Sequence, residues 1–121
     1  MENELEATAD LIKSMINDHN KDYLTEKQID RFGRCLKRVL KLQWKHTWNP
    51  NQPKSGNGFR SLWVYPEEGM NQYLHETCKA CQIYSSNLKL ALPLDFTIWV
   101  NPGQVRYCLG DKNNVVTVYQ K

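Results

Sequence analysis

The spacing most suggestive of metal or redox chemistry is Cys78-Lys79-Ala80-Cys81, with His75 three residues upstream. A tetrahedral zinc site needs four ligands, and no second cysteine or histidine pair follows at finger-like spacing. A thioredoxin-type motif opens a helix, where the helix dipole lowers the thiol pKa, whereas this one falls late in an expected helix. Cysteines three residues apart in a helix are more simply small core residues, so we predict that role and no metal site.

Residues that could perform acid–base or nucleophilic catalysis do not converge in this sequence. Most carboxylates crowd the first 30 residues, while Asp95 and Asp111 stand alone. The chain has no G-x-S-x-G, P-loop or G-x-G-x-x-G motif, and the glycines of "GNGF" (56–59) are typical of a tight turn. We therefore predict a binding protein without catalytic residues or a cofactor, not an enzyme.

A run of basic residues without an intervening acid lies within an expected helix. It comprises Arg31, Arg34, Lys37, Arg38, Lys41 and Lys45. With Trp44 and Trp48 close by, one interpretation is a site for single-stranded nucleic acid that uses Arg34, Arg38 and Lys41. The other interpretation is the solvated face of an amphipathic helix, which explains the same spacing fully and is favoured.

Length and composition describe one ordinary globular domain. The chain has 121 residues, is 40% hydrophobic and 24% charged, and contains no apolar run of the ~20 residues that cross a bilayer. The acidic N-terminus is unlike a targeting segment, so we expect an intracellular protein with reduced cysteines and no membrane partner. Charge is uneven, because residues 1–30 hold eight of the 13 acids but three of the 16 bases.

Hydrophobic periodicity predicts an α+β fold over residues 1–121. Two helices, at 3–18 and 25–46, are expected to form an antiparallel hairpin, with "TEKQ" (25–28) as a capping box. Pro66, Glu67 and Glu68 fit the first turn of a third helix that ends near Cys81, and 86–92 fit a further short helical turn. About four mostly antiparallel strands are expected, at 59–65, 95–101, 104–109 and 115–120, with a turn at 110–114.

The strand at 95–101 carries a tryptophan on the face opposite its apolar one. Phe96, Ile98 and Val100 alternate with Thr97, Trp99 and Asn101. Trp99 is then either covered by a helix or exposed as an anchor for a partner. Asn101 on the same face could orient that partner, because its amide both donates and accepts hydrogen bonds.

Two long segments resemble the signature boxes of the BTG/Tob antiproliferative proteins. "WKHTWNPNQPKSGNGFR" (44–60) resembles the first box, and "LPLDFTIWVNPGQVRYCLGDK" (92–112) resembles the second. The first match rests on Lys45, His46, Trp48, Pro50, Pro53, Gly56, Gly58, Phe59 and Arg60. The boxes span about 44–65 and 92–114 of a single domain, and "CQIYSSNLKLALP" is most similar to the branch containing the third and fourth BTG members.

The resemblance implies a monomeric adaptor in the cytoplasm and nucleus. Such an adaptor docks on the nuclease subunit of the cytoplasmic mRNA deadenylase, promotes mRNA deadenylation and restrains proliferation. The implied docking residues are Phe59, Trp99, Asn101 and Gln104. Asn101 and Gln104 stand where the family usually has acids, Phe59 where many members have tyrosine, and Gly103 where a side chain is usual. These departures imply docking that is weaker or retuned to another partner, and Asn101→Asp is expected to tighten it.

Overall fold

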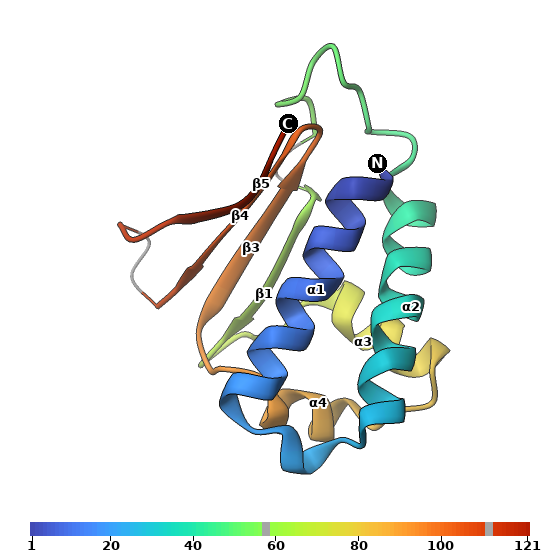
Figure 1. Ribbon diagram of the computed structural model, residues 1–121, viewed down its shortest axis with the longest axis vertical. Helices are drawn as coiled ribbons and strands as arrows, with labels where there is room; N and C mark the ends of the chain where they lie inside the picture. Colours follow the sequence, from blue (N-terminus) through green and yellow to red (C-terminus); the bar gives the residue numbers. More distant parts are fainter. Residues whose placement is uncertain (57–58, 111–112) are drawn as a thin grey trace.

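An antiparallel pair of long helices forms one layer of the protein in a computed structural model that describes residues 1–56, 59–110 and 113–121. Helix α1 (Glu2–His19) and helix α2 (Glu26–Trp44) lie side by side, joined by the short 3-10 helix η1 (Lys21–Tyr23) (Figure 1). The predicted helical hairpin is therefore confirmed, although α2 ends two residues before His46.

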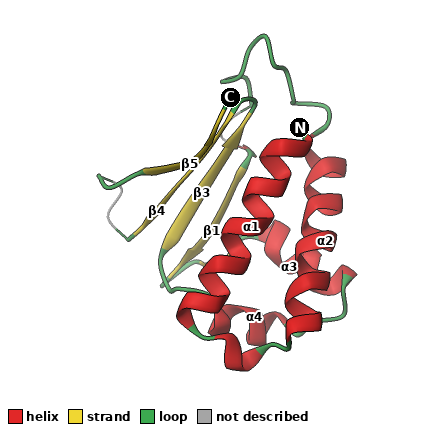
Figure 2. Ribbon diagram, viewed as in Figure 1, coloured by secondary structure: helices red, strands yellow, loops and turns green. Residues whose placement is uncertain are grey.

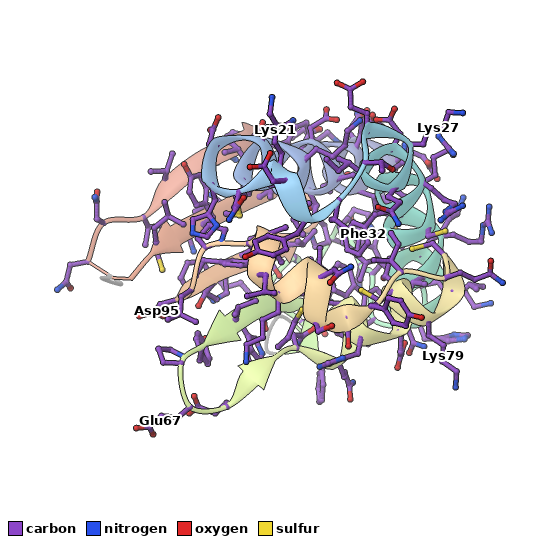
Figure 3. All side chains as sticks on the ribbon, turned by 90° about the horizontal axis from the view of Figure 1, so that it is seen from below. Lys21, Lys27, Phe32, Glu67, Lys79 and Asp95 are labelled. Carbon is purple, nitrogen blue, oxygen red and sulfur yellow. The ribbon has the colours of Figure 1, made fainter. Side chains whose placement is uncertain are left out.

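The helices bury the apolar stripes that their periodicity predicts. In α2, Phe32, Leu36, Leu40 and Trp44 recur every four residues and are almost fully buried. The predicted capping box is present: the Gln28 N–H donates to Thr25 Oγ1 at 3.1 Å, and the Thr25 N–H donates to Gln28 Oε1 at 2.9 Å. Figure 3 shows Phe32 among the packed side chains, whereas the lysine of the α2 first turn, Lys27, projects outward.

The second layer is an antiparallel sheet of strand order β2-β1-β3-β4-β5 (Figure 2). Its strands are β1 (Ser61–Tyr65), β2 (Gly69–Met70), β3 (Phe96–Asn101), β4 (Gln104–Leu109) and β5 (Val116–Gln120). Leu62, Ile98 and Val105 face the helices and are fully buried. This face and the two helices enclose the core, which leaves the opposite sheet face without a helical layer (Figure 1).

The segment after β1 is a hairpin turn and not the predicted helix start. Tyr65 pairs with Gly69, so Pro66–Glu68 close a short hairpin and β2 becomes a fifth strand. Gly69 has φ +86°, which ends the turn without steric strain. Helix α3 (Gln72–Ala80) begins only where Asn71 Oδ1 caps the Tyr73 N–H at 2.9 Å. Its end near Cys81 agrees with the prediction, as does helix α4 (Ser85–Ala91).

None of the helices described is both long and apolar enough to cross a membrane.

Candidate protein-docking site

The four residues that the sequence assigns to docking meet at one end of the sheet. Trp99 pairs with Ser61 of β1, and Asn101 pairs with Gln104 across the β3–β4 turn. Phe59 lies two residues before Ser61, next to Arg60, whose carbonyl accepts the Val100 N–H at 2.9 Å. Segments 40 residues apart in the chain thus bring these side chains to one corner of the molecule.

The two aromatic side chains of this corner differ in exposure. Phe59 is 71% exposed, an unusual position for a phenylalanine in a folded domain. Trp99 is half-buried and lies on the sheet face that the helices do not cover, because the alternating residues Ile98 and Val100 are in the core. The interpretation in which a helix covers Trp99 is therefore wrong, and the interpretation of Trp99 as an anchor for a partner stays a prediction.

Arg60 organises this corner, a role that sequence reasoning missed. Its side chain is fully buried and donates hydrogen bonds of 2.9–3.1 Å to six oxygens. The acceptors are the carbonyls of Thr47, Pro53, Ser55 and Val100, the hydroxyl of Thr47 and Oδ1 of Asn101. Its guanidinium carbon also lies 5.5 Å from the centroid of the Trp48 ring. Arg60 therefore fixes the loop before β1 onto the end of β3.

Asn101 is part of this internal network. Its Oδ1 accepts from Arg60 Nη2 at 3.0 Å, so its acceptor is engaged within the chain. All six acceptors around Arg60 are uncharged, and burial lowers the pKa of the guanidinium. The sequence did contain one signal of this role, an arginine directly before a strand whose next core residue is Leu62.

The β3–β4 turn is held from two sides. Gly103, with φ +82°, donates its N–H to Oε2 of the buried Glu4 of α1 at 2.8 Å. Its carbonyl accepts the Lys121 N–H at 2.8 Å, and Gln104 Nε2 donates to Gln120 Oε1 at 2.8 Å. The turn that presents Asn101 and Gln104 is therefore preorganised by α1 and β5.

The basic residues of α2 divide into paired and exposed members. Lys41 Nζ lies 2.7 Å from Glu2 Oε1, whereas Arg34 and Arg38 are exposed on the helix surface. Trp44 is 1% exposed and packs edge-on against Tyr73, with ring centroids 5.5 Å apart. Its ring is thus unavailable for base stacking, and the nucleic-acid interpretation loses one of its two tryptophans.

The C-x-x-C cysteines are core residues, as predicted. Cys78 and Cys81 are 1% and 3% exposed, while His75 is exposed on another side of α3. Burial raises the pKa of Cys78 to about 12 and that of Cys81 to about 11, so neither thiol is activated. No cluster of three potential metal ligands occurs in the described parts of the chain. Gly58 and Asp111 lie outside the described residues.

The fold is that of an α+β domain in which a helical pair covers one face of an antiparallel sheet. The BTG family model matches residues 1–119, and the chain belongs to that family. Human Protein BTG3 is 29% identical over 119 residues, which cover 98% of this chain and 45% of BTG3. Human Protein BTG1 is 27% identical over 100 residues, which cover 83% of this chain and 57% of BTG1.

A solved structure agrees with this assignment. The BTG/Tob domain of C. elegans FOG-3 superposes with a TM-score of 0.82 at 19% identity, covering 100% of this chain and 91% of that one. The predicted family and fold class are thus confirmed, and the BTG3 matches agree with the expected branch. This chain spans less than half the length of BTG3.

Proposed function

We propose that this chain is a non-enzymatic adaptor that docks on the nuclease subunit of the cytoplasmic mRNA deadenylase. By doing so it would promote mRNA deadenylation and restrain proliferation, acting as a monomer in the cytoplasm and nucleus. The observation that carries the proposal is the placement of Phe59 and Trp99 at one corner of the sheet, beside a turn fixed from both sides.

Aromatic side chains on a rigid frame are well suited to binding a protein. Buried aromatic anchors dominate the energetics of most interfaces, and a preorganised surface loses little conformational entropy on binding. The Arg60 network and the Glu4–Gly103 hydrogen bond supply that frame. Next to Trp99, the stacked rings of Trp63 and Tyr65, 4.7 Å apart, add apolar area to the same face.

The two polar residues assigned to docking are neutral, whereas the exposed Arg106, which pairs with Trp99 across β3 and β4, is basic. Asn101 and Gln104 offer amides where an acid would attract a basic partner, and each is already hydrogen-bonded within the chain. Aromatic contacts would therefore contribute more to docking than Asn101 and Gln104 do.

The test is binding of the purified nuclease subunit to the wild-type chain and to three alanine variants. Trp99→Ala and Phe59→Ala should each weaken the complex at least about tenfold, while the fold, followed by circular dichroism, survives. Tyr84→Ala is the matched control, because Tyr84 is 80% exposed and lies at the start of α4. Absence of binding at micromolar concentration, or equal losses in all three variants, would refute the proposal.

A further inference from the structure

An apolar groove lies on the other side of the sheet from Trp99, between α1 and the β4–β5 hairpin. Two adjoining hollows of about 290 and 330 Å³ form it, and they share Leu11 and Ser14 of α1. We call this the α1–β5 groove, and its apolar lining includes Leu11, Met15, Pro93, Tyr107, Leu109 and Val118. Figure 1 shows the cause: the β4–β5 hairpin bends away from α1 at the end distant from the two termini.

The exposed apolar side chains of the hairpin gather along this groove. Leu109 is 52% exposed, Val118 is 40% exposed, and Val116, which pairs with Tyr107, is 43% exposed. Helix α1 covers the centre of the sheet and leaves these residues of the helix-facing side uncovered. Contiguous exposed apolar surface of this kind, rimmed by polar groups, is typical of a binding surface.

The acidic groups along the groove are unpaired. Of the five acids of α1, Glu2, Glu4 and Glu6 form ion pairs with Lys41, the N-terminal amine and Lys37. Asp10 and Asp18, both exposed, form no ion pair among the described residues, and both line the groove. They lie eight residues apart on one helix, about 12 Å at 1.5 Å per residue.

We propose that the α1–β5 groove binds an amphipathic helix of a second protein. The apolar stripe of that helix would lie against Leu11, Tyr107 and Leu109, and basic residues beside the stripe would meet Asp10 and Asp18. A helix fits because it would continue the layer of α1 over the uncovered strands, as helices do in two-layer α+β folds. The charge of the rim selects a basic partner over an acidic one.

The test uses a designed helical peptide of about 18 residues, roughly five turns. Leucines at i, i+3, i+4 and i+7 form one stripe, with lysines beside it about 12 Å apart. The comparison peptide has glutamates in place of the lysines. Fluorescence anisotropy with the full chain should give saturable binding of the lysine peptide in the micromolar range and at least about tenfold weaker binding of the glutamate peptide.

Variants of exposed residues locate the binding. Leu109→Lys and Val118→Lys should each weaken binding of the lysine peptide at least about tenfold. Asp18→Asn should weaken that binding about two- to fivefold. Leu42→Lys is the control, because Leu42 is 60% exposed but lies on α2. All four side chains reach solvent, so these variants should fold, which thermal unfolding checks.

Three results would overturn the proposal. One is the absence of saturable binding up to about 1 mM, a weak-affinity limit. Another is binding that Leu109→Lys and Val118→Lys leave unchanged. The third is self-association of the chain at the concentrations used that Leu109→Lys abolishes, because the occupant would then be a second copy and not a partner helix.

Discussion

At the scale of single residues, the hydrogen bond between Arg60 and Asn101 has the largest effect on the corner formed by Phe59, Trp99, Asn101 and Gln104. A buried guanidinium is surrounded by six oxygens, of which none carries a charge. Buried charges are usually paired, so this arrangement holds a net positive charge directly beneath the docking corner. The residue that would supply the missing carboxylate by the smallest change is Asn101.

Asn101→Asp should raise the free energy of unfolding by about 1 kcal/mol at pH 7, since a neutral hydrogen bond to Arg60 becomes charge-assisted. Arg60 would lower the folded-state pKa of the introduced carboxyl below its usual ~3.9. The gain in stability is then present above about pH 4 and is lost as the pH falls through the pKa that the introduced carboxyl has in the folded state of the Asn101→Asp variant. Urea titrations of the wild type and the Asn101→Asp variant between pH 7 and pH 3 measure this difference in stability.

The same variant separates two explanations of docking. If its affinity for the nuclease subunit rises without a gain in stability, the carboxylate faces the partner and not Arg60. A gain in stability with unchanged affinity would mean that the carboxylate belongs to the internal network around Arg60, as the 3.0 Å hydrogen bond between Arg60 and Asn101 indicates.

Arg60→Met should destabilise the chain by about 3 kcal/mol, because it removes the donor to the buried Val100 carbonyl and to the partly buried carbonyls of Thr47, Pro53 and Ser55. Arg38→Met is the matched control, and this exposed α2 residue should change stability by less than about 0.5 kcal/mol. Chemical denaturation compares them. Similar denaturation midpoints for the two variants would show that the hydrogen bonds of Arg60 contribute little to stability.

At the scale of elements, α1 is connected to the docking turn through Glu4. Glu4 is 6% exposed, and its carboxylate accepts the Gly103 N–H at 2.8 Å and lies 3.4 Å from the N-terminal amine. Because the side chain belongs to the first turn of α1, the helix position determines where the β3–β4 turn sits. The turn is thus part of the rigid core and not a free loop.

Glu4→Ala should cost about 1–3 kcal/mol and increase amide hydrogen exchange at Gly103, since the N–H loses its acceptor. Glu6→Ala is the control, because it removes only the exposed ion pair with Lys37. It should lower the free energy of unfolding by less than about 1 kcal/mol and leave amide exchange at Gly103 unchanged. NMR-detected exchange gives the comparison. Equal Gly103 protection in the wild type and Glu4→Ala would exclude this link.

Local patterns predicted the elements well, and long-range contacts explain where they did not. The α1 and α2 stripes and the capping box follow from helical spacing alone. Pro66-Glu67-Glu68 suits a helix start and a hairpin turn equally, and the pairing of Tyr65 with Gly69 decides between them. The docking residues were inferred from family resemblance, whereas the hydrogen bonds of Arg60 reach up to 41 residues along the chain, so its place directly before β1 did not reveal its partners.

At the scale of the whole molecule, the sheet separates two surfaces of different chemistry. Phe59 and Trp99 lie at the corner and on the face without helices, whereas the α1–β5 groove opens on the helix-covered face. The unpaired acids Asp10 and Asp18 border the groove, and neutral amides border the docking corner. If both proposals hold, two partners can bind at once, because neither would occupy the other's face.

Binding at the two surfaces should therefore be independent. Trp99→Ala should leave the affinity for the lysine peptide unchanged, and Leu109→Lys should leave the affinity for the nuclease subunit unchanged. For each ligand, the double variant should show the loss of the one single variant that affects it, within about 0.5 kcal/mol. Isothermal titration of each ligand against the four proteins measures this. A change of about 1 kcal/mol or more in either cross measurement would mean that a substitution on one face of the sheet alters binding on the other face.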